Sequence, residues 1–174
     1  MKITLRMNPE SISDAVKQLN EYRDSLPRKA ELIRQRVTEE LKNLVEEGFN
    51  GAFYDGLLYE GWKVPSVDVY TKNDDEISVV IADGKEAVFI EFGAGVYFNP
   101  GGSAHPSRPP GIVNIGEYGK GRGKRQIWGY YDKNGELHLT HGTPASMPMF
   151  LAAKEIAEKI PSIARDVFQG GDST

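Results

Sequence analysis

The sequence predicts an α+β fold with two N-terminal helices, a small antiparallel sheet made of hairpins, a long loop rich in glycine and proline, and a C-terminal helix. Three observations support this prediction. Apolar residues recur every three or four positions in the N-terminal region and again after Pro148, which is the helical period. β-branched and aromatic runs separated by short polar intervals lie between these regions, as in hairpins. A chain of 174 residues buries one main core, so we expect a single domain over residues 1–169 and a frayed tail over 170–174.

The N-terminal region predicts two consecutive helices. Asn8 followed by Pro9 has the pattern of a helix N-cap with a proline in the first turn. An apolar stripe follows at helical spacing, formed by Ile12, Val16, Leu19 and Tyr22. Because proline lacks the amide hydrogen that an interior helical position donates, Pro27 is expected to end the first helix. The second helix is expected from Arg28 to Phe49, with apolar residues on one face and charged residues on the other.

Two hairpins are predicted in the middle of the chain. The β-branched runs 67–71 and 77–81 flank a polar interval and form the first. The runs 126–131 and 136–141 flank an Asn-Gly pair, a strong turn signal, and form the second. Between the hairpins, residues 87–92 have the pattern of either a buried strand or a short helix. After the second hairpin the helical period returns, which predicts a last helix with a kink at Pro161.

The loop predicted over residues 99–125 is expected to be flexible and ends in a basic segment. Residues 116–125 contain four basic side chains: Lys120, Arg122, Lys124 and Arg125. A phosphate-binding loop of the Walker type is not expected, because Tyr118 stands at its glycine position and Arg125 at its Ser or Thr position. The basic segment is instead a candidate contact for DNA or for an acidic partner, with a solvated loop as the alternative.

Composition excludes several classes of chemistry. The chain has no cysteine, so disulfides, thiolate metal sites and cysteine nucleophiles are excluded. The net charge of -4 argues against a dedicated nucleic-acid binder, although the middle of the chain is locally basic. There is no apolar run of membrane-spanning length and no apolar stretch of a secretory signal at the amino terminus, so we expect a cytosolic protein without membrane contact.

The histidines and aromatic residues were weighed as candidate sites. His138 and His141 stand three apart on a predicted strand and therefore point to opposite faces, so with His105 they do not predict a metal site. A cofactor is not expected either. Trp128 and Tyr130 could stack on single-stranded nucleic acid, but aromatic residues on strands more often belong to a core or a subunit interface. We therefore predict that both residues contribute to a subunit interface.

Two short motifs carry a resemblance to a known family. The first is the VFIEFGAG segment, which contains Glu91, Phe92 and Gly93, and the second is THGTPASMPMFLAA, which contains Pro144, Pro148 and Phe150. Together with the order of the predicted elements, they resemble the tail-completion, or head-tail joining, proteins of lambdoid long-tailed phages over nearly the whole chain. The chain departs from the family pattern at Met149, which separates Pro148 from Phe150, and in its longer loop.

The resemblance implies a bacteriophage structural protein without catalysis. It implies subunits that associate into a ring between the connector and the tail tube, with transient DNA contact as the DNA passes through, in the virion and in the host cytoplasm during assembly. The motif residues would then be fold determinants, because Gly93 permits a sharp turn and Pro148 presets φ at a helix start. Two alternatives stay open: a nucleic-acid-binding module that uses the basic segment 116–125, and a small hydrolase or nuclease.

Overall fold

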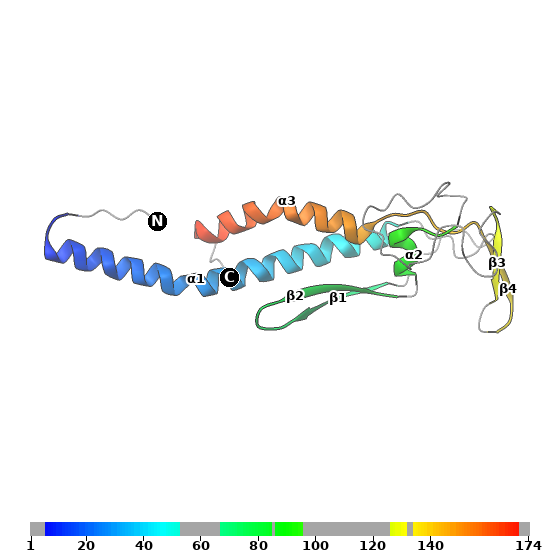
Figure 1. Ribbon diagram of the computed structural model, residues 1–174, viewed down its shortest axis with the longest axis horizontal. Helices are drawn as coiled ribbons and strands as arrows, with labels where there is room; N and C mark the ends of the chain where they lie inside the picture. Colours follow the sequence, from blue (N-terminus) through cyan, green and yellow to red (C-terminus); the bar gives the residue numbers. More distant parts are fainter. Residues whose placement is uncertain (1–5, 53–66, 85, 96–125, 132–133, 171–174) are drawn as a thin grey trace. The chain divides into compact units, whose positions relative to one another are not determined.

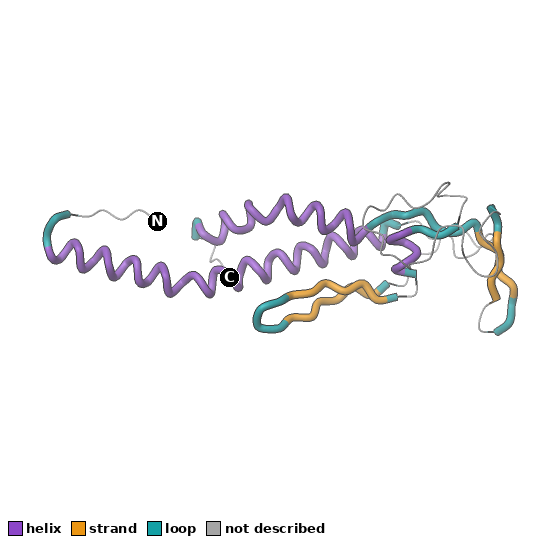
Figure 2. The backbone as a smooth tube through the Cα atoms, in the orientation of Figure 1, coloured by secondary structure: helices purple, strands orange, loops and turns teal. Residues whose placement is uncertain are grey.

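The computed structural model describes residues 6–52, 67–84, 86–95, 126–131 and 134–170, and this part of the chain combines helices and strands (Figure 1). It contains three helices and two antiparallel sheets of two strands each (Figure 2). The mixed fold that the sequence predicts is therefore confirmed. The predicted loop 99–125 and the predicted tail beyond residue 170 lie outside the described residues.

The described residues fall into two units. The first is formed by Met1–Val37 together with Lys159–Thr174, and the second by Thr38–Glu158. The long helices α1 (Pro9–Asn50) and α3 (Pro148–Phe168) each contribute residues to both units. The expectation of a single domain over residues 1–169 stays a prediction.

Helix α1 replaces the two helices that the sequence predicts. The predicted N-cap is confirmed, since Oδ1 of Asn8 accepts a hydrogen bond from the amide of Ser11 at 2.8 Å. The predicted break at Pro27 is wrong, because the helix continues through Pro27 to Asn50. Pro27 and the carbonyl that loses its donor, that of Arg23, both belong to exposed residues, where water can satisfy the carbonyl.

The first unit buries little of the N-terminal part of α1. The residues of the predicted stripe, Ile12, Val16, Leu19 and Tyr22, are exposed by 38 to 54%, and Leu26 one turn further on is 37% exposed. Near the other end of this unit, Val167 of α3 is fully buried. Nζ of Lys29 lies 5.3 Å from the ring centroid of Phe168, which links α1 to the end of α3 by a cation–π contact.

The first predicted hairpin is confirmed as β1 (Asp68–Asn73) and β2 (Ser78–Asp83), paired so that Tyr70 faces Ile81. Asp74 shapes the turn, because its Oδ1 accepts hydrogen bonds from the amides of Glu76 and Ile77. The ambiguous segment that follows is helical and forms α2 (Ala87–Phe92). Gly93 ends this helix with φ 76°, and its amide donates to the carbonyl of Phe89 at 2.8 Å.

The core of the second unit joins α1, α2 and α3 and is covered by the first hairpin. Its buried residues are Val45, Phe49, Ala87, Ile90 and Ala152. Half-buried apolar residues pack around them: Leu41, Leu44, Ala52, Val67, Val69, Val80, Ala82 and Met149. Full burial of a side chain such as that of Ile90 stabilises the fold by about 1.5 to 3 kcal/mol, so this cluster holds the unit together.

The second predicted hairpin is confirmed as β3 (Trp128–Tyr131) and β4 (Leu137–Thr140). Gly135 has φ 83°, which suits the predicted Asn-Gly turn. Helix α3 follows and runs through Pro161 to Phe168. None of the helices in the described part of the chain has a stretch apolar and long enough to cross a membrane.

Candidate functional site

The two motifs of the sequence meet at the start of α3. Glu91 of α2 is only 7% exposed, and its carboxylate lies against the first turn of α3. Oε2 of Glu91 accepts a hydrogen bond from the amide of Met149 at 2.8 Å, and Oε1 accepts one from the amide of Phe150 at 3.0 Å. We call this contact, together with the backbone pairing of Ala94 with Thr143, the motif junction.

Glu91 accepts the free amides at the start of α3, as an N-cap side chain would, although it lies far from them in the sequence. The carbonyl of Met147 accepts the first helical bond of α3, from the amide of Leu151, so Met147 holds the N-cap position. A methionine side chain has no oxygen that could accept the free amides of the first turn. Pro148 removes one of these donors, and Glu91 accepts the next two. The negative carboxylate also suits the positive end of the helix dipole.

A short antiparallel pairing fixes the rest of the motif junction. Ala94 and Thr143 exchange both backbone hydrogen bonds, at 2.8 and 2.9 Å. The amide of Ser146 donates to the carbonyl of Ile90 at 2.8 Å. A Cβ atom on Gly142 would lie 2.1 Å from the carbonyl oxygen of Ala94, so this close approach requires glycine.

Helix α1 also touches the junction. A Cβ atom on Gly48 would lie 2.8 Å from Cβ of Pro148, which shows that the backbone of α1 passes directly beside the first residue of α3. Pro148 is buried at this point. The motif residues Glu91, Gly93 and Pro148 therefore serve capping, a sharp turn and helix packing. Both oxygens of the Glu91 carboxylate accept hydrogen bonds from backbone amides, so the carboxylate stabilises the fold.

A second feature is an exposed apolar face of the hairpin formed by β3 and β4. Side chains of directly paired residues share a face, and Tyr131 pairs with Leu137 while Gly129 pairs with Leu139. The exposed side chains on this face are those of Tyr131 (72%), Leu137 (56%) and Leu139 (37%), and Ile127 (42%), which directly precedes β3, is exposed as well. We call these four residues the hairpin surface. Several apolar side chains exposed together on one face are typical of a site that another protein covers.

Gly129 lies in the middle of the hairpin surface and lets the leucines of β4 lie across β3. A Cβ atom at Gly129 would lie 2.9 Å from Cδ1 of Leu137 and 3.2 Å from Cδ2 of Leu139. The methyl groups of the two leucines therefore occupy the space that a side chain at residue 129 would need.

The other residues that the sequence singles out are placed as follows. Trp128 and Tyr130 belong to β3, and only their backbone is described. The basic residues Lys120, Arg122, Lys124 and Arg125 lie outside the described residues, as does His105. His138 and His141 lie on and just after β4. Within the described ranges, no group of three or more histidine, aspartate or glutamate side chains could hold a metal ion.

Sequence reasoning missed the hairpin surface. Trp128 and Tyr130 were selected because large aromatic side chains dominate interfaces. The face of the hairpin that the neighbouring residues share was not considered. The missing signal was the alternation itself, since Tyr131, Leu137 and Leu139 follow the period of two and fall on one face.

No family model matches the chain, and comparison with curated proteins and with solved structures likewise gives no match.

Proposed function

We propose that the protein is a structural component of a long-tailed bacteriophage, a ring subunit of the head-tail joining or tail-completion region. It acts in virion assembly and in DNA passage, and its partners are further copies of itself and the connector and tail-tube proteins. The observation that carries this proposal is the hairpin surface, an apolar face that a subunit interface would cover.

The motif junction supports the same proposal. The resemblance to tail-completion proteins implies that the two motifs determine the fold. Glu91 caps α3 and Pro148 packs against α1, and both are roles of this kind. A protein whose distinctive residues serve its fold suits a role in assembly.

Complementation of virion assembly tests the proposal. Heads or tails that lack this component are mixed with the wild-type chain, and infectious particles are counted. We expect wild type to restore particles and a Tyr131→Ser/Leu137→Ser variant to fail, because both substitutions remove apolar area from the hairpin surface. Trp128 and Tyr130, which the sequence predicts as interface residues, are tested in the same assay with a Trp128→Ala/Tyr130→Ala variant, which is also expected to fail.

The matched control is Leu151→Ser on α3. Leu151 is 53% exposed, close to the exposure of Leu137, but it lies outside the hairpin surface. This control should restore particles as well as wild type does. Circular dichroism of all variants must show an intact fold. Failure of the wild-type chain to bind heads or tails, in any order of addition, would contradict the proposed function.

A further inference from the structure

The chain contains two Asn-Gly pairs, Asn50 with Gly51 and Asn134 with Gly135. Asparagine is a thermolabile residue, and it reacts most readily before glycine. Glycine has no side chain to hinder the approach of its backbone nitrogen to the amide carbon of the asparagine side chain. The two pairs contain the same reacting groups, so a difference in their reactivity reflects the structure around each pair.

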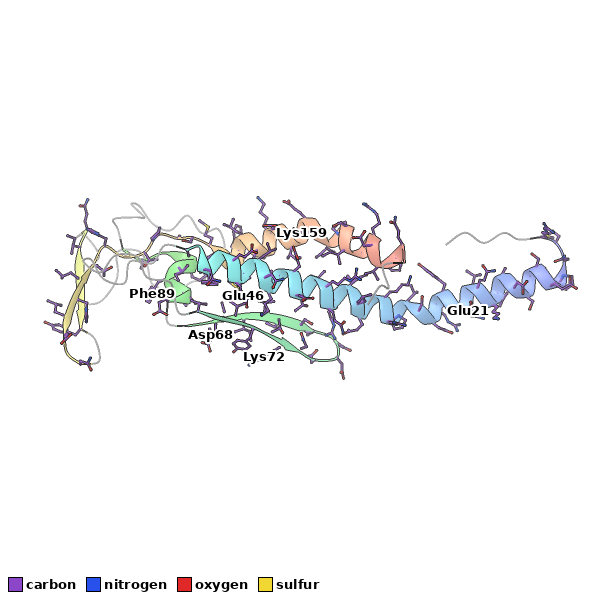
Figure 3. The ribbon with its side chains drawn as sticks, turned by 180° about the vertical axis from the view of Figure 1, so that it is seen from behind. Glu21, Glu46, Asp68, Lys72, Phe89 and Lys159 are labelled. Carbon is purple, nitrogen blue, oxygen red and sulfur yellow. The ribbon has the colours of Figure 1, made fainter. Side chains whose placement is uncertain are left out.

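The first pair is held in place by α1. The amide of Gly51, whose nitrogen would attack, donates a hydrogen bond to the carbonyl of Glu47 at 2.9 Å. Phe49, which directly precedes the pair, is only 2% exposed and belongs to the core of the second unit. This part of α1 can be followed in Figure 3, where Glu46 is labelled one helical turn before Asn50. Attack by the Gly51 nitrogen therefore requires the end of the helix to open.

The second pair lies in the turn between β3 and β4. Asn134, Gly135 and the following Glu136 are all exposed. Gly135 has φ 83°, and a Cβ atom built on it would meet no other atom within 4 Å. Rotation of the peptide between Asn134 and Gly135 therefore meets no packed side chain at the glycine. The pair can reach the geometry of ring closure without the opening of a helix or of the core.

We propose that Asn134 is a site of spontaneous deamidation in the folded protein, and that the fold protects Asn50 from the same reaction. The nitrogen of Gly135 loses its proton to hydroxide and forms a bond to Cγ of Asn134. The bond from Cγ to Nδ2 breaks, and Nδ2 leaves as ammonia with a proton taken from water. One water molecule then opens the five-membered succinimide ring to aspartate or to isoaspartate. The sum of these steps is the hydrolysis of one amide, so no oxidant or reductant takes part.

The isoaspartate product changes the backbone of the turn. Its main chain runs through Cγ, so one more carbon atom separates residues 134 and 135. The turn joins strands in which Tyr131 pairs with Leu137, and the geometry of a turn sets the register of its hairpin. Both of these side chains belong to the hairpin surface, so the modification disturbs that surface. The aspartate product keeps the ordinary backbone and only adds a negative charge.

Ageing of the full-length protein tests the proposed site. The folded protein is incubated at mildly alkaline pH, and samples are digested with pepsin at acidic pH, where the reaction is slow. Mass spectrometry of the peptides detects the replacement of the amide NH2 by OH. We expect Asn134 to react at least about tenfold faster than Asn50, because reaction at Asn50 also requires a backbone hydrogen bond of α1 to break.

The unfolded chain is the reference for this comparison. In concentrated urea the two rates should become similar, because neither pair is then held by the fold. Equal rates at Asn50 and Asn134 in the folded protein would overturn the proposal. It would also be overturned if Asn134 stayed intact in the folded protein while both positions reacted in urea, since the turn would then protect it.

Asn134→Gln is the matched variant for the chemistry. Glutamine keeps the side-chain amide, but its additional CH2 group makes attack by the Gly135 nitrogen form a larger, less favourable ring. The variant should lose the modification at residue 134 and leave the slow reaction at Asn50 unchanged. A peptide around residue 134 that gains mass as fast in this variant as in wild type would show that another group reacts.

Hydrogen exchange tests the consequence for the hairpin. The isoaspartyl form is purified by ion exchange and compared with Asn134→Asp, which has the same charge on an ordinary backbone. Amides of β3 and β4 should exchange faster in the isoaspartyl form than in this variant. Equal exchange would refute the effect on the hairpin surface. Neither measurement involves heads or tails, so both results hold whether or not the proposed phage function does.

Discussion

Glu91 accepts a hydrogen bond from the amide of Met149 at 2.8 Å, between residues that are 58 positions apart in the sequence. The second oxygen of the same carboxylate accepts the amide of Phe150. A helix that begins with Met147 and Pro148 cannot cap itself, so its start depends on a residue of α2. The fold of the second unit therefore contains a long-range contact in which capping and tertiary packing are the same interaction.

Replacement of Glu91 should destabilise the protein well beyond a surface substitution. Glu91→Ala leaves two amides of α3 without their acceptor in a buried place, and we expect the free energy of unfolding to fall by about 2 to 5 kcal/mol. Glu91→Gln keeps one acceptor oxygen but turns an amino group toward the other amide, so its loss should be smaller, about 1 to 2 kcal/mol. Urea titration followed by circular dichroism measures both.

The control for this pair is Glu158→Gln, at an exposed position of α3. A surface substitution of this kind should change the free energy of unfolding by no more than about 0.5 kcal/mol. A Glu91→Ala loss as small as that of the control would mean that the capping contact does not stabilise α3.

Gly142 should tolerate no side chain, whereas Gly135 should tolerate alanine at moderate cost. Both have positive φ, 93° and 83°, but a Cβ at Gly142 would clash with the carbonyl of Ala94 while a Cβ at Gly135 meets nothing within 4 Å. Gly135→Ala should therefore cost only the left-handed backbone penalty of about 1 to 2 kcal/mol. Gly142→Ala should cost at least about 3 kcal/mol, because it also separates Ala94 from Thr143. Equal thermal unfolding temperatures for the two variants would rule out the close approach.

Gly48→Ala should lower stability although alanine is the better helix former. In an exposed helix this change stabilises by about 1 kcal/mol. Here the added Cβ would lie 2.8 Å from Cβ of Pro148, and overpacking of this kind costs about 1 to 3 kcal/mol, so we expect a net loss. Glu47→Ala, at the preceding exposed position, is the control and should be neutral or slightly stabilising. A stabilised Gly48→Ala variant would show that the two helices can separate without cost.

Local sequence signals predict the local elements well. The Asn8 cap, both hairpins and the start of α3 at Pro148 follow from cap, turn and proline patterns that act over a few residues. The pattern of residues 87–92 left strand and helix open, because a run of six residues of which five are apolar fits a short buried segment of either type. The structure selects the helix, with Ala87 and Ile90 one turn apart in the core.

Contacts between distant segments are beyond this kind of reasoning. The motif that contains Glu91 was recognised, but its role as the cap of α3 depends on residues 58 positions away. The hairpin surface was missed for a different reason, because aromatic size was weighted above strand alternation. Exposure of Tyr131 and Leu137 depends on what the rest of the fold leaves uncovered, which a local pattern does not contain.

The continuity of α1 through Pro27 gives the last prediction. Proline costs about 3 kcal/mol relative to alanine inside a helix, because it removes one backbone hydrogen bond and its ring presses on the preceding turn. Ser25 adds a local contact, since its hydroxyl donates to the carbonyl of Tyr22 at 2.7 Å. In Pro27→Ala the amide of residue 27 can donate to the carbonyl of Arg23. We therefore expect the free energy of unfolding to rise by about 1 to 3 kcal/mol and the helical signal in circular dichroism to increase.

Pro9→Ala is the matched control for Pro27→Ala, because Pro9 occupies the first helical position, where the amide has no helical acceptor in any case. This control should change stability by less than about 0.5 kcal/mol. Hydrogen exchange of the amides around residue 27 adds a local measurement, since a restored hydrogen bond should slow exchange there and leave the first turn unchanged. A drop in stability for Pro27→Ala, with faster exchange on both sides of it, would mean that the chain needs a break at this position and that two separate helices describe the N-terminal region better.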